Sequence, residues 1–272
     1  MAKIAVLQMT SGIDPEVNFD TIRHAASRSA EAGAAMLFTP EMSLLLNRDR
    51  ARAAANILSQ DQSPYVERLG ELSRATGVTV ALGSMAVTEP SGRWANRSML
   101  FAPGASAPIT YDKIHMFDVD LASGESWRES GAYRAGEDVV VVEETPVGRL
   151  GLAVCYDLRF PALFEALGNR RCDVIAIPAA FTVPTGAAHW HVLQRARAIE
   201  ASAYVVAAAQ VGEHEDGRRT YGHSLVVDPW GEVLLDMGGQ EQGLGFAEID
   251  LARIADVRAQ VPSLANRRKI GA

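Results

Sequence analysis

The residue best suited to covalent chemistry is Cys155, in the segment LGLAVCYDLRFP. A cysteine that ends an apolar run is often a core residue that packs as a small hydrophobic side chain. Here the run stops at Cys155 and polar residues follow, which favours a sharp turn from a strand into a helix. A thiol at a helix N-terminus has a lowered pKa and lies near N–H groups that can bind an oxyanion. The residues around Cys155 leave both interpretations open.

The only other cysteine is Cys172, in the segment NRRCD between a predicted helix and a predicted strand. We interpret Cys172 as structural. Two cysteines in 272 residues do not form a disulfide framework.

A thiol nucleophile needs a base and a group that stabilises the oxyanion. None of the six histidines lies in a familiar cysteine-protease signature. His189 and His191 could suggest a metal pair, but residues two apart on a helix point to different faces. The sequence therefore predicts no metal site.

Two charged residues also follow predicted strands. Glu41 comes just after Thr39-Pro40, and Lys113 lies in the segment YDKIH. Taken alone, Glu41 is typical of a surface glutamate at the start of a helix, where it interacts favourably with the helix dipole. Lys113, taken alone, is typical of a solvated lysine on an edge strand. Neither residue by itself indicates a site.

Strand and helix signals alternate along the chain. Apolar runs predict strands at residues 4–9, 35–38, 78–87, 98–101, 150–155, 174–177, 204–209, 225–227 and 232–235. Capping and proline signals predict helices at residues 14–32 and 63–77, from Pro161 onward, and at residues 189–201 and 251–260. This alternation predicts an α/β fold with helices covering stacked sheets, and it brings the ends of several strands to one rim. Because no linker divides the chain, we expect a single domain over residues 1–272.

Three segments together resemble the nitrilase, or carbon–nitrogen hydrolase, superfamily. They are FTPEMS around Glu41, YDKIHMFDVD around Lys113 and GLAVCYDLRFP around Cys155. The resemblance continues through PAAFTVPTGAAHWHVLQRARAIE, YVVAAAQ and YGHSLVVDPWG, so it covers essentially the whole chain. It implies an α-β-β-α sandwich whose protomers pair through helices into a homodimer or a higher homo-oligomer.

The resemblance also implies roles for individual residues. Glu41 matches the general base, Lys113 the oxyanion-stabilising lysine and Cys155 the nucleophile of a Glu–Lys–Cys triad. Glu129 matches a second glutamate, which would position Lys113 or orient the hydrolytic water.

Three further residues are expected to bind the substrate. Arg159 and Phe181 match positions that line the substrate pocket, with Arg159 suited to a carboxylate. The structural alternative is an ion pair for Arg159 and core packing for Phe181. The backbone N–H of Tyr156 is suited to be the second oxyanion donor.

Within the superfamily, AAAQVGEHEDGRRTYGHS and VVDPWG most resemble the Nit-type amidases that act on deaminated glutathione. The resemblance implies hydrolysis through a thioester, without a metal or an organic cofactor. The near alternative is an ω-amidase that acts on α-ketoglutaramate. An N-carbamoyl amino acid hydrolase, a nitrilase, an N-acyltransferase and a catalytically silent binding module also remain open.

Composition excludes some partners. The formal net charge is −7, which gives no electrostatic support for binding nucleic acid. No apolar run approaches the ~18 residues that a membrane span needs, and the N-terminal MAKIAVLQMT lacks the long apolar region of a signal peptide. We therefore expect a soluble cytoplasmic protein.

Overall fold

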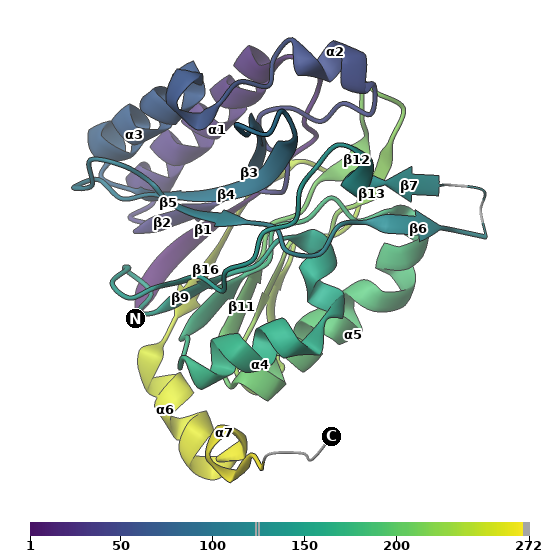
Figure 1. Ribbon diagram of the computed structural model, residues 1–272. Coiled ribbons are helices and arrows are strands. Elements are labelled where there is room, and N and C mark those ends of the chain that lie inside the picture. The colour runs from purple at the N-terminus through teal and green to yellow at the C-terminus, as the bar shows by residue number, and fades with distance from the viewer. Residues whose placement is uncertain (123, 125, 269–272) are drawn as a thin grey trace.

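The computed structural model describes residues 1–122, 124 and 126–268. The predicted domain extends to Ala272, so its last four residues lie outside the described part. Two six-stranded sheets dominate the fold, and they stack with helices on their outer faces (Figure 1). This is the predicted α-β-β-α sandwich.

The first sheet has the strand order β16-β1-β2-β3-β4-β5. Its three central strands β1, β2 and β3 are parallel, and the flanking strands pair antiparallel. The bounds are β1 (Ala2–Gln8), β2 (Met36–Phe38), β3 (Thr79–Thr88), β4 (Trp94–Phe101), β5 (Ile109–Asp112) and β16 (Gly243–Ile249).

The second sheet repeats this plan with the order β15-β14-β11-β10-β9-β8. Strands β9, β10 and β11 form its parallel centre, and β8, β14 and β15 pair antiparallel. The bounds are β8 (Val141–Val142), β9 (Leu150–Leu152), β10 (Val174–Ala176), β11 (Tyr204–Ala207), β14 (Leu225–Val227) and β15 (Val233–Asp236). Two small hairpins lie outside the sheets: β6 (Asp118–Asp120) with β7 (Ser126–Arg128), and β12 (Val211–Glu213) with β13 (Arg219–Tyr221).

Helices cover each sheet on the side away from the other sheet (Figure 1). Helices α1 (Pro15–Glu31) and α3 (Pro64–Thr76) lie over the first sheet, with the short α2 (Arg50–Ala54) beside them. Helices α4 (Pro161–Asn169) and α5 (Val183–Ala201) lie over the second sheet. The C-terminal helices α6 (Leu251–Gln260) and α7 (Ser263–Asn266) extend away from the sandwich.

The predicted capping signals agree with the observed helix ends. The Asp14 carboxylate accepts a hydrogen bond from the backbone N–H of Glu16 at 2.9 Å, which caps α1. Gly77 ends α3 with a φ of 71°, the left-handed conformation that favours glycine. Helix α5, however, begins six residues before the predicted His189. Its first turn contains Pro184 and Gly186, which resemble a loop in sequence, although Pro is well tolerated at the start of a helix.

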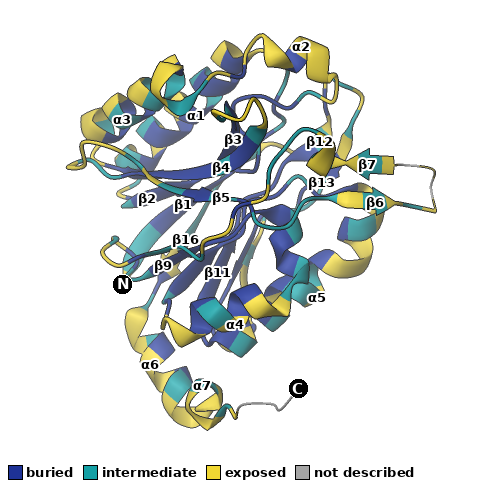
Figure 2. Cartoon of the chain, viewed as in Figure 1, coloured by how far each residue is buried: buried dark blue, intermediate teal, exposed yellow. Residues whose placement is uncertain are grey.

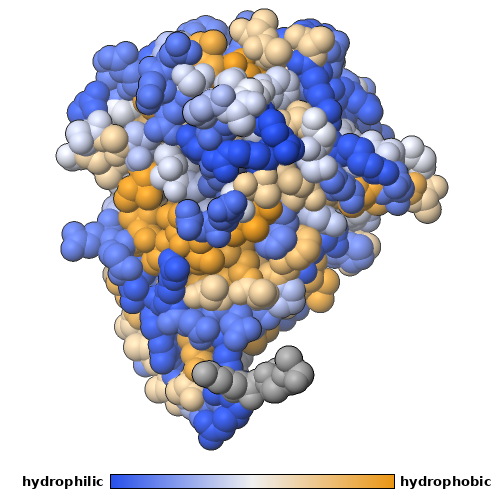
Figure 3. Space-filling view, viewed as in Figure 1, coloured by the Kyte–Doolittle hydropathy of each residue, from blue (hydrophilic) through white to orange (hydrophobic). Residues whose placement is uncertain are grey.

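Burial follows the layers, since the strands are mostly buried and the helices are exposed on their outer faces (Figure 2). The largest hydrophobic cluster contains residues of both sheets, including Val6 and Phe38 from the first and Leu150 and Val206 from the second. Packing between the two sheets therefore fixes how the strand ends of one sheet meet those of the other. On the surface, an apolar band crosses the face shown in Figure 3, over the region of β5 and β9.

Among the described residues, no helix combines the length and the hydropathy that crossing a bilayer requires. A cytoplasmic location stays a prediction.

Candidate active site

Cys155 lies in a tight turn between the second sheet and α4. Strand β9 ends at Leu152, three residues before the predicted end, and Cys155 begins a 3-10 helix, η3 (Cys155–Arg159). Its φ is 50°, a conformation that costs energy for a residue with a Cβ. The backbone N–H of Cys155 donates to the carbonyl of Pro178 at 2.8 Å, and the residue is only 7% exposed. The thiol is thus fixed at the start of a strained turn.

Glu41 lies in the loop that follows β2. Its neighbour Met42 also has a left-handed φ, of 55°, and the backbone N–H of Met42 donates to Ser84 Oγ at 2.9 Å. Gly83 packs against this loop so closely that a Cβ would lie 2.1 Å from the carbonyl oxygen of Thr39. Only glycine fits there, and its place in β3 brings the first sheet up against the Glu41 loop.

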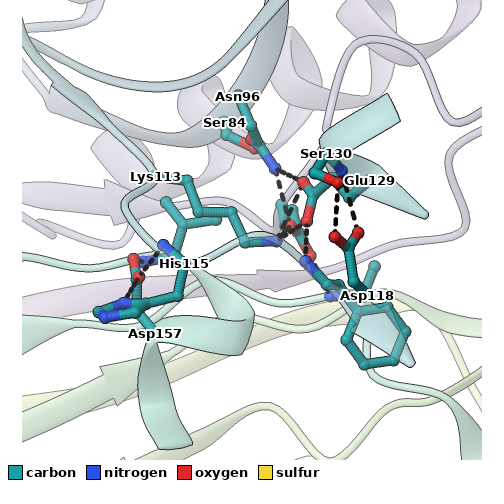
Figure 4. Close-up of polar contacts among 12 residues, drawn as sticks. Ser84, Asn96, Lys113, His115, Asp118, Glu129, Ser130 and Asp157 are labelled. Carbon is teal, nitrogen blue, oxygen red and sulfur yellow. Dashed lines mark hydrogen bonds and ion pairs between the residues drawn. The ribbon is translucent and has the colours of Figure 1, made fainter. Parts of the chain in front are cut away.

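Lys113 joins two carboxylates at the centre of the site. Its ammonium donates to Glu41 Oε1 at 2.9 Å, and to Glu129 Oε2 at 2.9 Å and Oε1 at 3.1 Å. The Asn96 amide donates to the same two carboxylates, at 2.9 Å to Glu41 and 3.1 Å to Glu129. Figure 4 shows the Lys113 and Asn96 side chains pointing toward Glu129. The other oxygen of Glu41 accepts from the backbone N–H of Ala180 at 2.9 Å.

The interpretation of Glu41 and Lys113 as surface residues, drawn from each residue alone, is wrong. Glu41 is 5% exposed and Lys113 is 1% exposed. Burial alone would raise the pKa of the Glu41 carboxyl, but the Lys113 ammonium and hydrogen bonds from Cys155, Lys113 and Asn96 hold it below its usual value. Burial alone would lower the pKa of Lys113, but Glu129 and Glu41 raise it well above its usual value. The Glu41 carboxylate and the Lys113 ammonium therefore both remain charged at neutral pH.

The Cys155 thiol differs from the expectation of a lowered pKa. Burial and the Glu41 carboxylate raise the pKa of Cys155 well above its usual value, and the opposing effect of Lys113 is smaller. Two carboxylates and one ammonium already leave this cluster with one net negative charge, so a thiolate would add a second. The resting state is a neutral thiol beside an ionised carboxylate.

Asp157 is a positioning residue that the sequence analysis missed. It is fully buried, and it accepts hydrogen bonds from Tyr111 Oη at 2.7 Å, the backbone N–H of His115 at 3.0 Å and the backbone N–H of Val154 at 2.9 Å. The His115 ring lies 2.7 Å from it (Figure 4). Asp157 thus ties the segment around Lys113 to the turn of Cys155. The only sequence signal is an aspartate two residues after the cysteine.

A single pocket of about 160 Å³ contains the candidate groups. Glu41, Lys113, Glu129 and Cys155 all line it. Its other lining residues include the apolar Leu45, Ile57 and Ala86, the aromatic Trp94, Phe117, Trp127, Tyr133, Tyr156 and Phe181, and the polar or basic Asn47, Arg48, Arg50, Arg128 and Arg218. The structure thus brings all four predicted catalytic residues to one pocket.

Of the three predicted substrate-binding residues, Tyr156 and Phe181 line this pocket and Arg159 lies beside them. The Arg159 guanidinium carbon lies 5.8 Å from the centre of the Tyr156 ring and 5.4 Å from that of Phe181. Arg159 Nη1 is also 3.2 Å from the His189 ring nitrogen Nδ1. Binding of a carboxylate by Arg159 stays a prediction.

The predicted structural residue Cys172 is fully buried in the hydrophobic core. Among the described residues, one group has a geometry that could hold a metal ion: His191, His223 and Asp236. This group includes Asp236 from β15 but does not include His189. None of its three residues lines the pocket. Each histidine ring is within hydrogen-bond distance of the Asp236 carboxylate, at 3.0 and 2.9 Å.

The pocket combines the groups that acyl transfer needs. A thiol, an ionised carboxylate able to take its proton, and an ammonium able to stabilise an oxyanion face one space.

Comparison with known proteins agrees with this arrangement. The family model described as carbon-nitrogen hydrolase matches residues 3–259. A protein from Yersinia enterocolitica named deaminated glutathione amidase is 39% identical over 98% of this chain and 93% of its own length. The Caenorhabditis elegans nitrilase and fragile histidine triad fusion protein NitFhit is 38% identical over 97% of this chain, which spans only 60% of the length of that fusion protein.

Comparison with solved structures supports the same family assignment. The crystal structure of NitFhit matches with a TM-score of 0.89 at 37% identity, over 98% of this chain and 66% of that chain. An amidase from Nesterenkonia sp. AN1 matches with a TM-score of 0.79 at 26% identity, over 96% of this chain and 98% of its own. That structure is a glutamate-to-glutamine variant with acrylamide added to its active-site cysteine. The chain described here belongs to the carbon–nitrogen hydrolase family and is an amide-hydrolysing enzyme.

Proposed function

We propose that this enzyme hydrolyses the amide bond of deaminated glutathione, with Cys155 as nucleophile, Glu41 as general base and Lys113 as oxyanion-stabilising cation. The observation that carries the residue roles is the buried contact of Lys113 with Glu41 and Glu129 beside the Cys155 thiol. The whole chain, residues 1–272, is proposed to form one hydrolase domain.

In the first half-reaction Glu41 takes the thiol proton while Cys155 Sγ attacks the amide carbon. Concerted proton transfer is needed because the thiol is neutral at rest. The carbonyl oxygen gains negative charge, which the Lys113 ammonium and the Tyr156 backbone N–H stabilise. The C–N bond then breaks, the leaving amine takes the proton from Glu41, and a thioester remains on Cys155.

In the second half-reaction Glu41 takes a proton from water, whose oxygen attacks the thioester carbon. The C–S bond breaks, the proton returns to Cys155 Sγ, and the carboxylic acid product leaves. Glu129 holds Lys113 in place during both steps through its two contacts with the ammonium. With deaminated glutathione the products are an α-keto dicarboxylate and Cys-Gly.

Two observations support this substrate. The Yersinia relative, 39% identical to this chain, is named for it, and the basic side chains that line the pocket suit a substrate with carboxylates. The α-ketoglutaramate of ω-amidases has the same acyl group but releases ammonia and not a dipeptide.

The test is a comparison of kcat/KM across deaminated glutathione, α-ketoglutaramate, N-carbamoyl amino acids and simple nitriles. We expect the highest value with deaminated glutathione, measured as Cys-Gly release. A higher value with α-ketoglutaramate would replace the proposed substrate and leave the proposed mechanism intact.

We also propose that the enzyme is at least a homodimer that pairs through helices. Helix α5 exposes Val192 by 62% and Ile199 by 50%, although both side chains are apolar. Light scattering at micromolar concentration is expected to give a mass of twice the 29.2 kDa chain or more. A mass of one chain would contradict this proposal.

A further inference from the structure

Three residues that line the pocket have buried hydrogen-bond donors that lack acceptors. Asn47, Trp127 and Arg218 all line the pocket, and each has a buried nitrogen without a partner: Nδ2, Nε1 and Nε respectively. A buried donor without an acceptor typically costs about 1–3 kcal/mol, so three in one region call for an explanation.

Two of these donors are stacked together. The Arg218 guanidinium carbon lies 4.7 Å from the centre of the Trp127 ring, and that of Arg48 lies 5.3 Å from it. Asp216 links the two arginines, since its Oδ2 accepts from the backbone N–H of Arg48 at 2.7 Å and lies 3.3 Å from Arg218 Nη2. The indole ring therefore lies against two cations.

The orientation of the third donor follows from its surroundings. Asn47 Oδ1 accepts from the backbone N–H of Asp49 at 3.1 Å and from Arg52 Nη2 at 3.0 Å. Exchanging the amide oxygen and nitrogen would set the NH₂ group against these two donors. The NH₂ group is therefore the part of Asn47 that remains without a partner.

Charge is distributed unevenly within the pocket. The Lys113 ammonium is matched by the carboxylates of Glu41 and Glu129. Arg218 has one carboxylate contact, to Asp216, and the Arg48 side chain forms no ion pair among the described residues. The region around Trp127 therefore has an excess of positive charge as well as an excess of donors.

We propose that Asn47, Trp127 and Arg218 form a subsite for the leaving group of the substrate, and that Arg48 adds charge to it. The ligand chemistry that fits is an acceptor-rich, anionic end, a carboxylate together with a peptide carbonyl. This inference rests on the proposed function. In deaminated glutathione the matching group is the glycine end of Cys-Gly, which α-ketoglutaramate lacks. The subsite would then select the longer amide.

The experiment uses three substrates: deaminated glutathione, the same compound with its glycine carboxylate converted to a carboxamide, and α-ketoglutaramate. Arg218→Met keeps the length of the side chain and removes its charge and donors. We expect a roughly ten- to hundredfold loss of kcat/KM with deaminated glutathione, since a charge-assisted contact is lost. The value for α-ketoglutaramate is expected to change less than about twofold, because it does not reach the subsite.

Three controls sharpen this result. Arg219→Met removes a neighbouring exposed arginine that does not line the pocket, and it is expected to leave all three substrates unchanged. Trp127→Phe removes the indole N–H but keeps an aromatic ring, so a loss of about two- to tenfold is expected with deaminated glutathione alone. The carboxamide substrate should be poor with wild type and should lose little more with Arg218→Met.

An equal loss for deaminated glutathione and α-ketoglutaramate in Arg218→Met, with an unchanged circular dichroism spectrum, would overturn the subsite. The subsite would also be overturned if wild type hydrolysed the carboxamide with the same kcat/KM as the acid. A wild type that releases no Cys-Gly from deaminated glutathione would instead overturn the proposed substrate, so the two failures are distinguishable.

Discussion

The two cysteines are alike in several respects and differ in their neighbours. Both are buried, with Cys155 7% exposed and Cys172 0% exposed. Cys155 has a left-handed φ of 50°, and Cys172 directly follows Arg171, whose φ is 57°. Burial raises the pKa of both thiols, to about 12 for Cys172. Neither burial nor a raised thiol pKa therefore distinguishes a nucleophile from a core residue.

What differs is the set of groups that each thiol faces. Cys155 lines the pocket beside an ionised carboxylate and a buried ammonium. Cys172 packs against Gly151 and Leu167, and its thiol sulfur lies 3.0 Å from where a Cβ on Gly151 would be. A neutral buried thiol becomes reactive only where a base can take its proton during attack, and Glu41 can do so for Cys155.

The largest expected effect tests this contrast directly. Cys155→Ala should lower kcat by about 10⁴-fold or more, because removing a nucleophile abolishes the covalent route. Cys172→Ala should keep kcat within about threefold of wild type. The measurement is turnover of the purified variants, with circular dichroism to check the fold. Activity near the wild-type value in Cys155→Ala would exclude this residue as the nucleophile.

The next effect concerns the carboxylate that holds Lys113. Glu129 accepts from Lys113, from Asn96 and from the backbone N–H of Phe117 at 2.7 Å, so all its partners are donors. In Glu129→Gln one NH₂ group must face a donor, and the Lys113 ammonium loses an opposite charge. We expect kcat to fall about 10²- to 10³-fold with a smaller change in KM, the pattern of weaker oxyanion stabilisation.

The matched control is Glu143→Gln, because the exposed Glu143 pairs only with Arg149 among the described residues. This variant should keep the kinetics of wild type. A large rise in KM with kcat unchanged in Glu129→Gln would show that Glu129 acts in substrate binding and not through Lys113.

The pH dependence reports on the base. The pKa of Glu41 is held below its usual value of 4.5 in the folded enzyme. The carboxylate therefore stays ionised as pH falls through 4.5, and its contribution to stability is present above 4.5 and lost as pH falls through the lower folded pKa. We expect the acid limb of kcat/KM to lie below pH 4.5, measured where circular dichroism shows an intact fold. An acid limb near pH 6 to 7 would contradict Glu41 as the base.

The sequence predicts the central strands and long helices well, because their apolar runs and caps are local signals. It misses β5, β6, β7, β8, β12, β13 and β16, which are mostly short or partly exposed and lack a clear apolar pattern. Strand β16 shows why: its Gly243 and Gly245 are typical of loops, yet it pairs antiparallel with β1 over seven residues. Pairing with the distant strand β1, and not local propensity, determines that β16 forms a strand.

For the site, local sequence misjudged Glu41 and Lys113 as exposed. Both residues follow strands of the first sheet, β2 and β5, and the tertiary fold brings these side chains, 72 positions apart, to within 2.9 Å. Only the family resemblance, and no periodicity or spacing, linked these residues to Cys155. Asp157 and Asn96 escaped prediction because their partners lie in other strands and loops of the fold.

The smallest effect returns to the second cysteine. Deleting the Cys172 sulfur leaves a small cavity beside Gly151 and Leu167 in the hydrophobic core. By comparison with other large-to-small core changes, Cys172→Ala should cost about 1–2 kcal/mol, which lowers Tm by roughly 2–8 °C in a protein of this size. Thermal melts of wild type and Cys172→Ala measure this shift, and Cys155→Ala is the comparison. Because the Cys155 thiol lines the pocket beside a charged cluster, removing its sulfur should lower Tm less than removing that of Cys172. A larger loss of stability in Cys155→Ala would mean that the thiol supports the fold of its turn, and the distinction between a reactive and a structural cysteine would then be one of degree.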